Sequence, residues 1–222
     1  MKPHQLGLVE YLIRRRTPVR ELADEWVAQN LPALTGKVIE LGALGDGRRT
    51  YAHGASEYIV TNIGPGCANP LDASNMDLPD ESVDGFLCES MLEHVADPQI
   101  VVAEIRRVLR PRGKLLILTP WMYPFHAAPD DFMRFSAPAL ARLLDGFKIV
   151  RSDPLGNFWT TVATFAQLKA QPWRHMSRAQ RAARIVAGAP LTGVGLASYA
   201  ASRVFKEHDD FAPMYAIFAE KN

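Results

Sequence analysis

The segment from Trp121 to Ser136 carries side chains that could act on a bound molecule. It contains several aromatic residues together with His126, Asp131 and Arg134. Because a histidine titrates near neutral pH, His126 is our candidate catalytic residue, acting as a general base. The alternative is structural: Asp131 pairs with Arg134, and His126 bonds to the backbone and shapes the loop. We predict a substrate-binding loop whose contacts come from Trp121, Tyr123, His126, Asp131 and Arg134.

A glycine-rich turn, Glu40-Leu41-Gly42-Ala43-Leu44-Gly45-Asp46-Gly47, is the second candidate site. Glycines let a backbone approach a ligand closely, and the amino end of a following helix offers unpaired N–H groups. Many such turns carry glycine for packing alone, so the turn by itself decides little. Its order, G-x-x-G-x-G, differs from the dinucleotide-binding G-x-G-x-x-G. An NAD-dependent oxidoreductase is therefore disfavoured.

The other polar residues predict no metal site. Cys67 and Cys88 form no CxxC pair, which argues against a disulfide framework or a cysteine-based zinc site. His94 precedes a predicted helix, and a hydrogen bond that shapes the loop is its simplest role. The remaining histidines show no spacing typical of metal ligands: His4, His53, His175 and His208.

Hydrophobic periodicity predicts alternating strands and helices. Strands are predicted over residues 37–41, 57–63, 83–88, 114–119, 147–152, 158–166 and 214–219. Helices are predicted over residues 5–16, 19–30, 98–110 and 136–145, with a short one over 47–54. The helix at 98–110 has one apolar stripe, and we expect Pro111 to end it.

This alternation is typical of a parallel α/β sheet with right-handed crossovers. In such sheets, ligands bind at the carboxyl ends of the strands. The glycine turn, Asn62, Asp72 and the segment after Cys88 should all lie at that edge. The sequence therefore predicts one site built from several strand ends.

Between Asp72 and Pro120 a series of short motifs occurs in fixed order: Asp72-Ala73, residues 78–84, residues 91–98, residues 104–113 and Thr119-Pro120. Here the chain resembles the class I S-adenosylmethionine (SAM)-dependent methyltransferases of the UbiE-like type, with a methyltransferase type 11 domain. The resemblance covers roughly residues 35–150 and 212–221. It implies an α/β, Rossmann-like, doubly wound, mostly parallel seven-stranded sheet with an antiparallel last strand and an α-helical N-terminal cap.

The resemblance also implies SAM as cofactor, and roles for residues near the glycine turn. Glu40 matches the acidic residue that orders the first loop. Gly42, Ala43 and Gly45 would lie under the methionine part of SAM. Asn62 stands where an acidic residue usually binds the ribose hydroxyls, so its hydrogen bonds should be weaker.

Further along the chain, the resemblance places Asp72 and Ala73 at the adenine edge. The next motif follows about two residues late, which makes Ser74, Asn75 and Met76 rival adenine contacts. Glu89 and Ser90 would border the methionine and the transferred methyl group. The Trp121–Ser136 segment resembles a substrate loop in one branch of the family.

The function implied is methyl transfer from SAM to a small-molecule acceptor. His126 favours a hydroxyl oxygen, such as that of a sugar, a polyketide or a quinol-like phenol. The alternative is a non-catalytic methyltransferase-fold protein that binds a partner or a ligand. Three departures from the family motivate this alternative: the glycine motif is one residue out of register, Asn62 replaces an acid, and Arg112 replaces a glycine.

Composition fits one domain, with 222 residues and a net charge of +1. This near-neutral charge gives no reason to expect nucleic-acid binding. The expected division is a helical cap over 1–35, a Rossmann-like core over 36–166 and 211–222, and a helical insertion over 167–210. A homodimer is compatible with this division.

An uncharged stretch, Ile185 to Ser202, approaches the length of a membrane span. It is rich in Ala, Gly and Ser and contains Pro190, so we expect a closely packed soluble segment and no integral span; a lid or membrane-surface contact is the alternative. The N-terminus does not resemble a secretion signal, because Arg14-Arg15-Arg16 follows its apolar run. A cytoplasmic location is expected.

Overall fold

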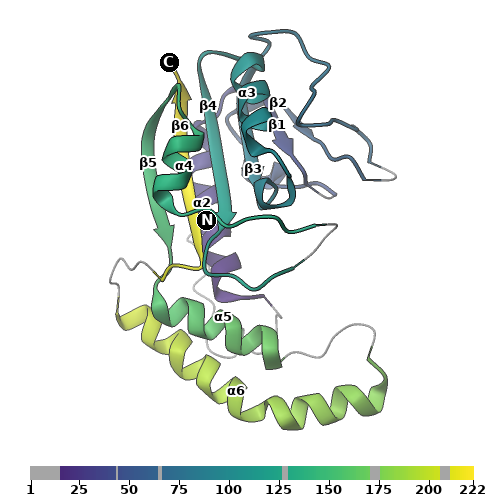
Figure 1. Ribbon diagram of the computed structural model, residues 1–222, viewed down its shortest axis with the longest axis vertical. Helices are drawn as coiled ribbons and strands as arrows, with labels where there is room; N and C mark the ends of the chain where they lie inside the picture. The colour runs from purple at the N-terminus through teal and green to yellow at the C-terminus, as the bar shows by residue number, and fades with distance from the viewer. Residues whose placement is uncertain (1–15, 44, 65–66, 127–129, 171–175, 206–210) are drawn as a thin grey trace. The chain divides into compact units, whose positions relative to one another are not determined.

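The computed structural model describes residues 16–43, 45–64, 67–126, 130–170, 176–205 and 211–222 (Figure 1). The predicted helix at 5–16 lies almost wholly outside them, as do His4, His175 and His208. The chain forms two compact units. The larger one comprises Trp26–Trp121, Phe125–Asp153 and Tyr215–Asn222, and the other comprises Met1–Glu25, Met122–Pro124 and Pro154–Met214.

The described residues form one six-stranded sheet with the order β2-β1-β3-β4-β6-β5. Its strands are β1 (Gly36–Leu41), β2 (Ala55–Val60), β3 (Val83–Glu89), β4 (Leu109–Pro120), β5 (Phe147–Leu155) and β6 (Met214–Lys221). β1 pairs in parallel with β2 and β3, and β3 pairs in parallel with β4. In Figure 1 the arrow of β6 runs opposite to that of β4. The Rossmann-like α/β class and the antiparallel last strand are confirmed.

The strand predicted at 158–166 is wrong, which leaves six strands instead of seven in the described part of the chain. These residues belong to helix α5 (Phe158–Ala170). Its start is fixed by Asn157, whose side-chain oxygen accepts a hydrogen bond from the Thr160 backbone N–H at 3.1 Å. A capping side chain of this kind outweighs the β-propensity of a Thr-Thr-Val run.

The helix α3 (Pro98–Val108) packs on the sheet through side chains that are fully buried, Val101, Ile105 and Val108. It ends earlier than predicted because Leu109 already pairs with Val83 as part of β4. The other helices of this unit are α4 (Ala137–Leu143) and the end of α2 (Pro18–Asn30), with a short 3-10 turn at Leu31–Ala33. The α-helix expected at 47–54 is reduced to a 3-10 turn, Arg49–Tyr51.

The second unit contains α5 and the long helix α6 (Arg178–Val204), which lie side by side in Figure 1. Ser177 caps α6: its hydroxyl accepts from the Gln180 N–H, and the Gln180 side chain accepts from the Ser177 N–H. By length and composition alone, α6 could cross a membrane, and 22% of its most apolar window is buried. A core helix would pass the same test, so this is weak evidence for a span.

Candidate functional site

The glycine turn after β1 needs glycine for its backbone conformation. Gly42, Gly45 and Gly47 have φ values of 72°, 61° and 52°, which side chains disfavour. A Cβ on Gly47 would also lie 2.0 Å from the Glu40 carboxylate. The turn at the carboxyl edge of the sheet therefore requires glycine at these positions.

Glu40 orders this turn from within. Its side chain is buried, and Oε2 accepts hydrogen bonds from the Arg48 backbone N–H at 2.7 Å and from the Tyr58 hydroxyl at 2.8 Å. Burial raises the pKa of Glu40. The carboxylate thus joins the turn to β2, in agreement with the loop-ordering role that the resemblance implied.

Asn62 follows β2 and is committed mainly to the protein's own backbone. Its Oδ1 accepts from the N–H groups of Ile63 and Gly64, and its Nδ2 donates to the Ala43 carbonyl at 3.1 Å. A hollow of about 330 Å³ adjoins these residues. Ala43, Gly45 and Asn62 line it together, so the fold brings three predicted cofactor residues to one place.

An ion pair lies beside the turn. Arg48 donates from Nε and Nη2 to the two oxygens of Glu89, each at 2.7 Å. The side chains are only 12% and 7% exposed. Glu89 ends β3, and the next residue, Ser90, has a φ of 50°. Glu89 was predicted from the sequence and Arg48 was not, although a cation directly after the last glycine of the turn was an available signal.

The residues predicted to contact adenine are not among the described residues that line this hollow. Asp72 Oδ1 accepts hydrogen bonds from the N–H and hydroxyl of Ser74, which lower the pKa of Asp72 and close a local turn. The Met76 side chain is buried in the core. Of the described residues that line the hollow, none is Asp72, Ala73, Asn75 or Met76. Their roles at the adenine edge stay predictions.

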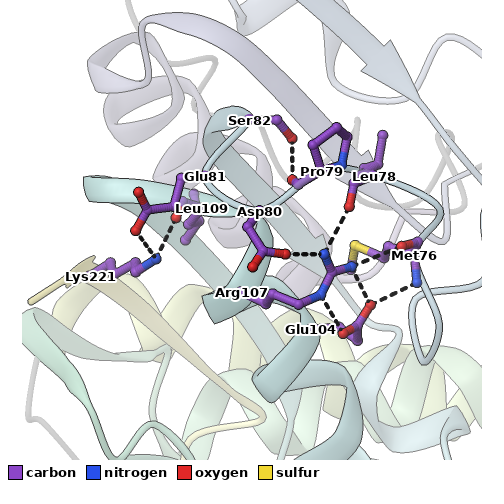
Figure 2. A network of polar contacts seen from close by, with 10 residues as sticks. All are labelled: Met76, Leu78, Pro79, Asp80, Glu81, Ser82, Glu104, Arg107, Leu109 and Lys221. Atoms are coloured by element: carbon purple, nitrogen blue, oxygen red, sulfur yellow. Dashed lines mark hydrogen bonds and ion pairs between the residues drawn. The ribbon is translucent and has the colours of Figure 1, made fainter.

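Figure 2 shows what the neighbouring motifs do: they fix residues 76–82 to α3. Arg107 donates to the carboxylates of Glu104 and Asp80 and to the carbonyls of Leu78 and Met76. Glu104 in turn accepts from the Met76 N–H at 2.9 Å. Much of the resemblance therefore rests on residues that hold the fold.

A larger hollow of about 670 Å³ lies beside this network. It is lined in part by Glu81, which precedes β3, and by Lys221, which ends the antiparallel β6. Both positions belong to the amino edge of the parallel strands. Since ligands of such sheets bind at the carboxyl edge, we place the site at the smaller hollow.

In the loop after β4, Asp131 and Arg134 form a buried ion pair. The Asp131 side chain is fully buried, and Arg134 donates to both of its oxygens, with Nη2–Oδ2 at 2.6 Å. The His126 backbone N–H donates to the same carboxylate at 2.8 Å. Together these bonds, led by that of Arg134, lower the pKa of Asp131. Asp131 and Arg134 therefore form the ion pair that was given as the structural alternative to a substrate-binding role.

Two imidazoles meet beside that pair. His126 Nδ1 lies 3.4 Å from Asp131 Oδ2, and its side chain is 37% exposed. The ring centroids of His126 and His94 are 5.1 Å apart in an edge-on arrangement. His94 Nδ1 contacts the Asp130 carbonyl, as expected for a loop-shaping histidine. Glu93, which the sequence analysis missed, is fully buried next to His94.

Trp121 and Tyr123 are both partly buried. Trp121 belongs to the same unit as His126, whereas Tyr123 belongs to the other one. Their contacts with a substrate stay predictions.

Known proteins share this fold and part of this sequence. Residues 58–117 match the family described as a methyltransferase domain. A protein of Mycolicibacterium smegmatis described as a probable S-adenosylmethionine-dependent methyltransferase is 34% identical over 170 residues. The match covers 73% of this chain and 61% of that relative, so the chain spans about three fifths of the relative's length.

Two solved structures show the same fold. A SAM-dependent methyltransferase from Archaeoglobus fulgidus is 17% identical with a TM-score of 0.58, over 91% of this chain and 94% of that one. A geranyl diphosphate C-methyltransferase from Streptomyces coelicolor, solved with S-adenosyl-L-homocysteine, is 12% identical with a TM-score of 0.58, over 91% and 79%. At these identities the likeness concerns the fold alone.

Proposed function

We propose that this chain is a SAM-dependent methyltransferase, which binds SAM beside its glycine turn and transfers the methyl group to a small-molecule acceptor. The observation that carries the proposal is the Arg48–Glu89 pair at the end of the turn. The acceptor, the cytoplasmic location and a homodimer remain predictions from the sequence.

The residues present fit the cofactor. The methionine end of SAM carries a carboxylate and an ammonium group. In our proposal the carboxylate bonds to Arg48 and the ammonium group to Glu89, in place of the bonds that join these two little-exposed side chains. Arginine suits a carboxylate because its planar group can donate two parallel hydrogen bonds. Asn62 has one Nδ2 hydrogen beyond the one donated to Ala43, which suits a single bond to a ribose oxygen.

When bound, SAM supplies a methyl group that its sulfonium makes electrophilic. The chain's task is then to align the acceptor with that group and to exclude water. Positioning of this kind can supply roughly 7–11 kcal/mol of the barrier. In our proposal, three parts of the chain align the acceptor and exclude water: the glycine turn, the Arg48–Glu89 pair and the loop after β4.

We propose a hydroxyl oxygen as the acceptor, because His126 lies against a carboxylate that is held ionised. The Asp131 carboxylate lies 3.4 Å from Nδ1 and can orient the imidazole ring. A proton on Nδ1 faces this carboxylate and places the ring's lone pair on Nε2. His126 would then take the hydroxyl proton through Nε2.

The first test is calorimetric titration with SAM and S-adenosylhomocysteine. Wild-type protein should bind both, and Arg48→Ala should weaken binding about tenfold or more, since a hydrogen bond to a charged group contributes about 1.5–3 kcal/mol. Arg142→Ala, at an exposed arginine of α4, is the matched control and should bind normally. Absence of binding to wild-type protein at millimolar ligand would overturn the enzyme proposal and favour the non-catalytic alternative.

The second test addresses His126. Release of S-adenosylhomocysteine is measured with a panel of sugar, phenol and amine acceptors. His126→Ala should lower kcat with hydroxyl acceptors by about 10²–10⁴-fold and leave SAM affinity unchanged. His53→Ala, at an exposed histidine, controls for the substitution. Unchanged turnover in His126→Ala, or turnover with amines alone, would contradict the general-base role.

A further inference from the structure

Glu93, His94 and His126 bring three potential metal ligands together. Their ligand atoms all lie within 4.8 Å of one another, and Glu93 Oε1 is 3.8 Å from His94 Nε2. Glu93 and His94 come from the 3-10 turn Leu92–His94 after β3, and His126 comes from the loop after β4. The spacing of these residues in the sequence did not indicate this cluster. No metal site was predicted from the sequence.

Glu93 supplies the second, independent observation. Its side chain is fully buried, and neither carboxylate oxygen has a hydrogen-bond partner among the described residues. A buried carboxylate without a partner is costly, and a bound cation is one of the few ways to satisfy both of its oxygens. A cation bound at this position would supply the partner that the buried Glu93 carboxylate lacks.

Each of the two histidines has its Nδ1 atom next to an oxygen atom of the protein. His94 Nδ1 contacts the Asp130 carbonyl, and His126 Nδ1 lies 3.4 Å from the Asp131 carboxylate. Arg134 Nη2 lies 3.5 Å from the same His126 nitrogen but already donates to Asp131 at 2.6 Å. Metal-binding histidines almost always donate one ring N–H to a carbonyl or carboxylate and bind metal through the other nitrogen.

We propose that Glu93, His94 and His126 bind a divalent transition metal ion, with zinc as the preferred ion. Imidazole and carboxylate ligands suit zinc, and two histidines with one glutamate leave a coordination position for water or substrate. Ligands at about 2.0–2.2 Å in a tetrahedron lie roughly 3.3–3.6 Å apart, so shifts of about 1 Å would close the site. It opens towards His126, the most exposed of the three side chains.

This proposal goes beyond the proposed function and does not depend on it. Metal binding through His126 Nε2 uses the lone pair that a general base would use. One protein molecule therefore cannot hold the metal and use His126 as a base at the same time. Titration with SAM reports on the Arg48–Glu89 region and titration with zinc reports on the histidines, so SAM binding and metal binding can each fail without the other. The general-base role of His126 applies to the metal-free protein only.

The experiment is a metal titration of the 222-residue protein after it has been stripped with chelator and dialysed. We expect one zinc ion per chain with micromolar or tighter affinity, and negligible Mg²⁺ binding. His126→Ala should weaken zinc binding by at least about tenfold, and Glu93→Gln should do likewise. His53→Ala, at an exposed histidine, should bind as wild type does.

Cobalt supplies a readout that does not depend on activity. Co²⁺ added to stripped protein should give the visible absorbance of a low-symmetry site, and His126→Ala should abolish it. Circular dichroism checks that each variant is folded, and His126 is exposed enough to be replaced without loss of the core. Absence of zinc binding at about 100 μM, or binding that His126→Ala leaves unchanged, would overturn the proposal.

Discussion

Asn62 and Arg112 both depart from the family pattern, but only Asn62 has a structural reason to be where it is. Asn62 bonds to three backbone groups and links the end of β2 to the glycine turn. Arg112 has a φ of 64°, a conformation that glycine adopts at no steric cost. Its contact with Glu220 is 3.5 Å long, and the arginine side chain is 85% exposed.

The substitution Arg112→Gly should therefore raise the free energy of unfolding. A left-handed conformation costs a non-glycine residue about 1–2 kcal/mol, and the extra chain entropy of glycine offsets about half of it. We expect a net gain of about 0.5–1 kcal/mol in urea unfolding, since an exposed ion pair contributes little. Arg112→Ala keeps the Cβ and removes only the ion pair. Equal stability of the two variants would contradict this explanation.

Single residues were predictable from the sequence where their partners are near in the chain. Asp131 and Arg134 are three residues apart, and their pairing was one of the two roles that the sequence analysis left open. Arg48 and Glu89 are 41 residues apart, and only the pairing of β1 with β3 brings their neighbourhoods together. Glu93 and His126 likewise come from different strand ends. These contacts depend on the sheet, which no local pattern encodes.

At the scale of the element, α5 shows how a cap can decide between helix and strand. A run of β-branched residues predicted a strand at 158–166, whereas Gly156, with a φ of 94°, and the Asn157 cap set a helix there. The glycine turn shows the opposite error. An α-helix was expected after it, but the Arg48 N–H is bonded to Glu40, and only a 3-10 turn follows.

The substitution Asn157→Ala should lower stability through α5. It removes the acceptor for the Thr160 N–H and the Nδ2 donor to the Phe205 carbonyl. Loss of a cap costs about 0.5–2 kcal/mol, so we expect about 1–2 kcal/mol for both bonds in thermal unfolding. Asn157→Ser keeps an acceptor at the cap and loses only the second bond. An unchanged melting temperature in Asn157→Ala would contradict the capping argument.

The continuous apolar strands were the most predictable elements. Residues 83–88 and 114–119 form the middle of the sheet, where burial on both faces selects uninterrupted hydrophobic runs. Their place in a mostly parallel sheet was predicted from the α/β alternation and the family resemblance. The sheet thus places the glycine turn, Asn62 and Glu89 at one edge, as predicted, while their individual contacts depend on side-chain packing.

At the scale of the whole molecule, the two compact units rely on different interactions. The larger one is built on the hydrophobic core of the sheet, whereas the other contains a polar cluster of Glu21, Tyr199 and Arg203. There, Tyr199 on α6 donates to Glu21 on α2 at 2.9 Å, and Arg203 donates to the Tyr199 hydroxyl at 2.6 Å. The second oxygen of Glu21 is buried without a hydrogen-bond partner among the described residues.

This group makes the stability of the chain depend on pH. Burial raises the pKa of Glu21 to about 7 from its ordinary value of 4.5, and the bond from Tyr199 offsets part of this effect. The folded state therefore binds more protons than the unfolded state between these two values. Its contribution to stability is fully present below the unfolded pKa and is lost as pH rises through about 7.

Replacement of Glu21 by Gln removes the titration and keeps a neutral side chain of similar size. Between pH 5 and pH 8, wild-type protein should lose about 1–2 kcal/mol more unfolding free energy than Glu21→Gln, a figure reduced for partial solvent screening. Urea unfolding at several pH values measures this difference. Glu57→Gln, at an exposed glutamate, controls for the change of charge. If the curves of wild type and Glu21→Gln ran parallel across this range, Glu21 would not be the group that burial keeps protonated.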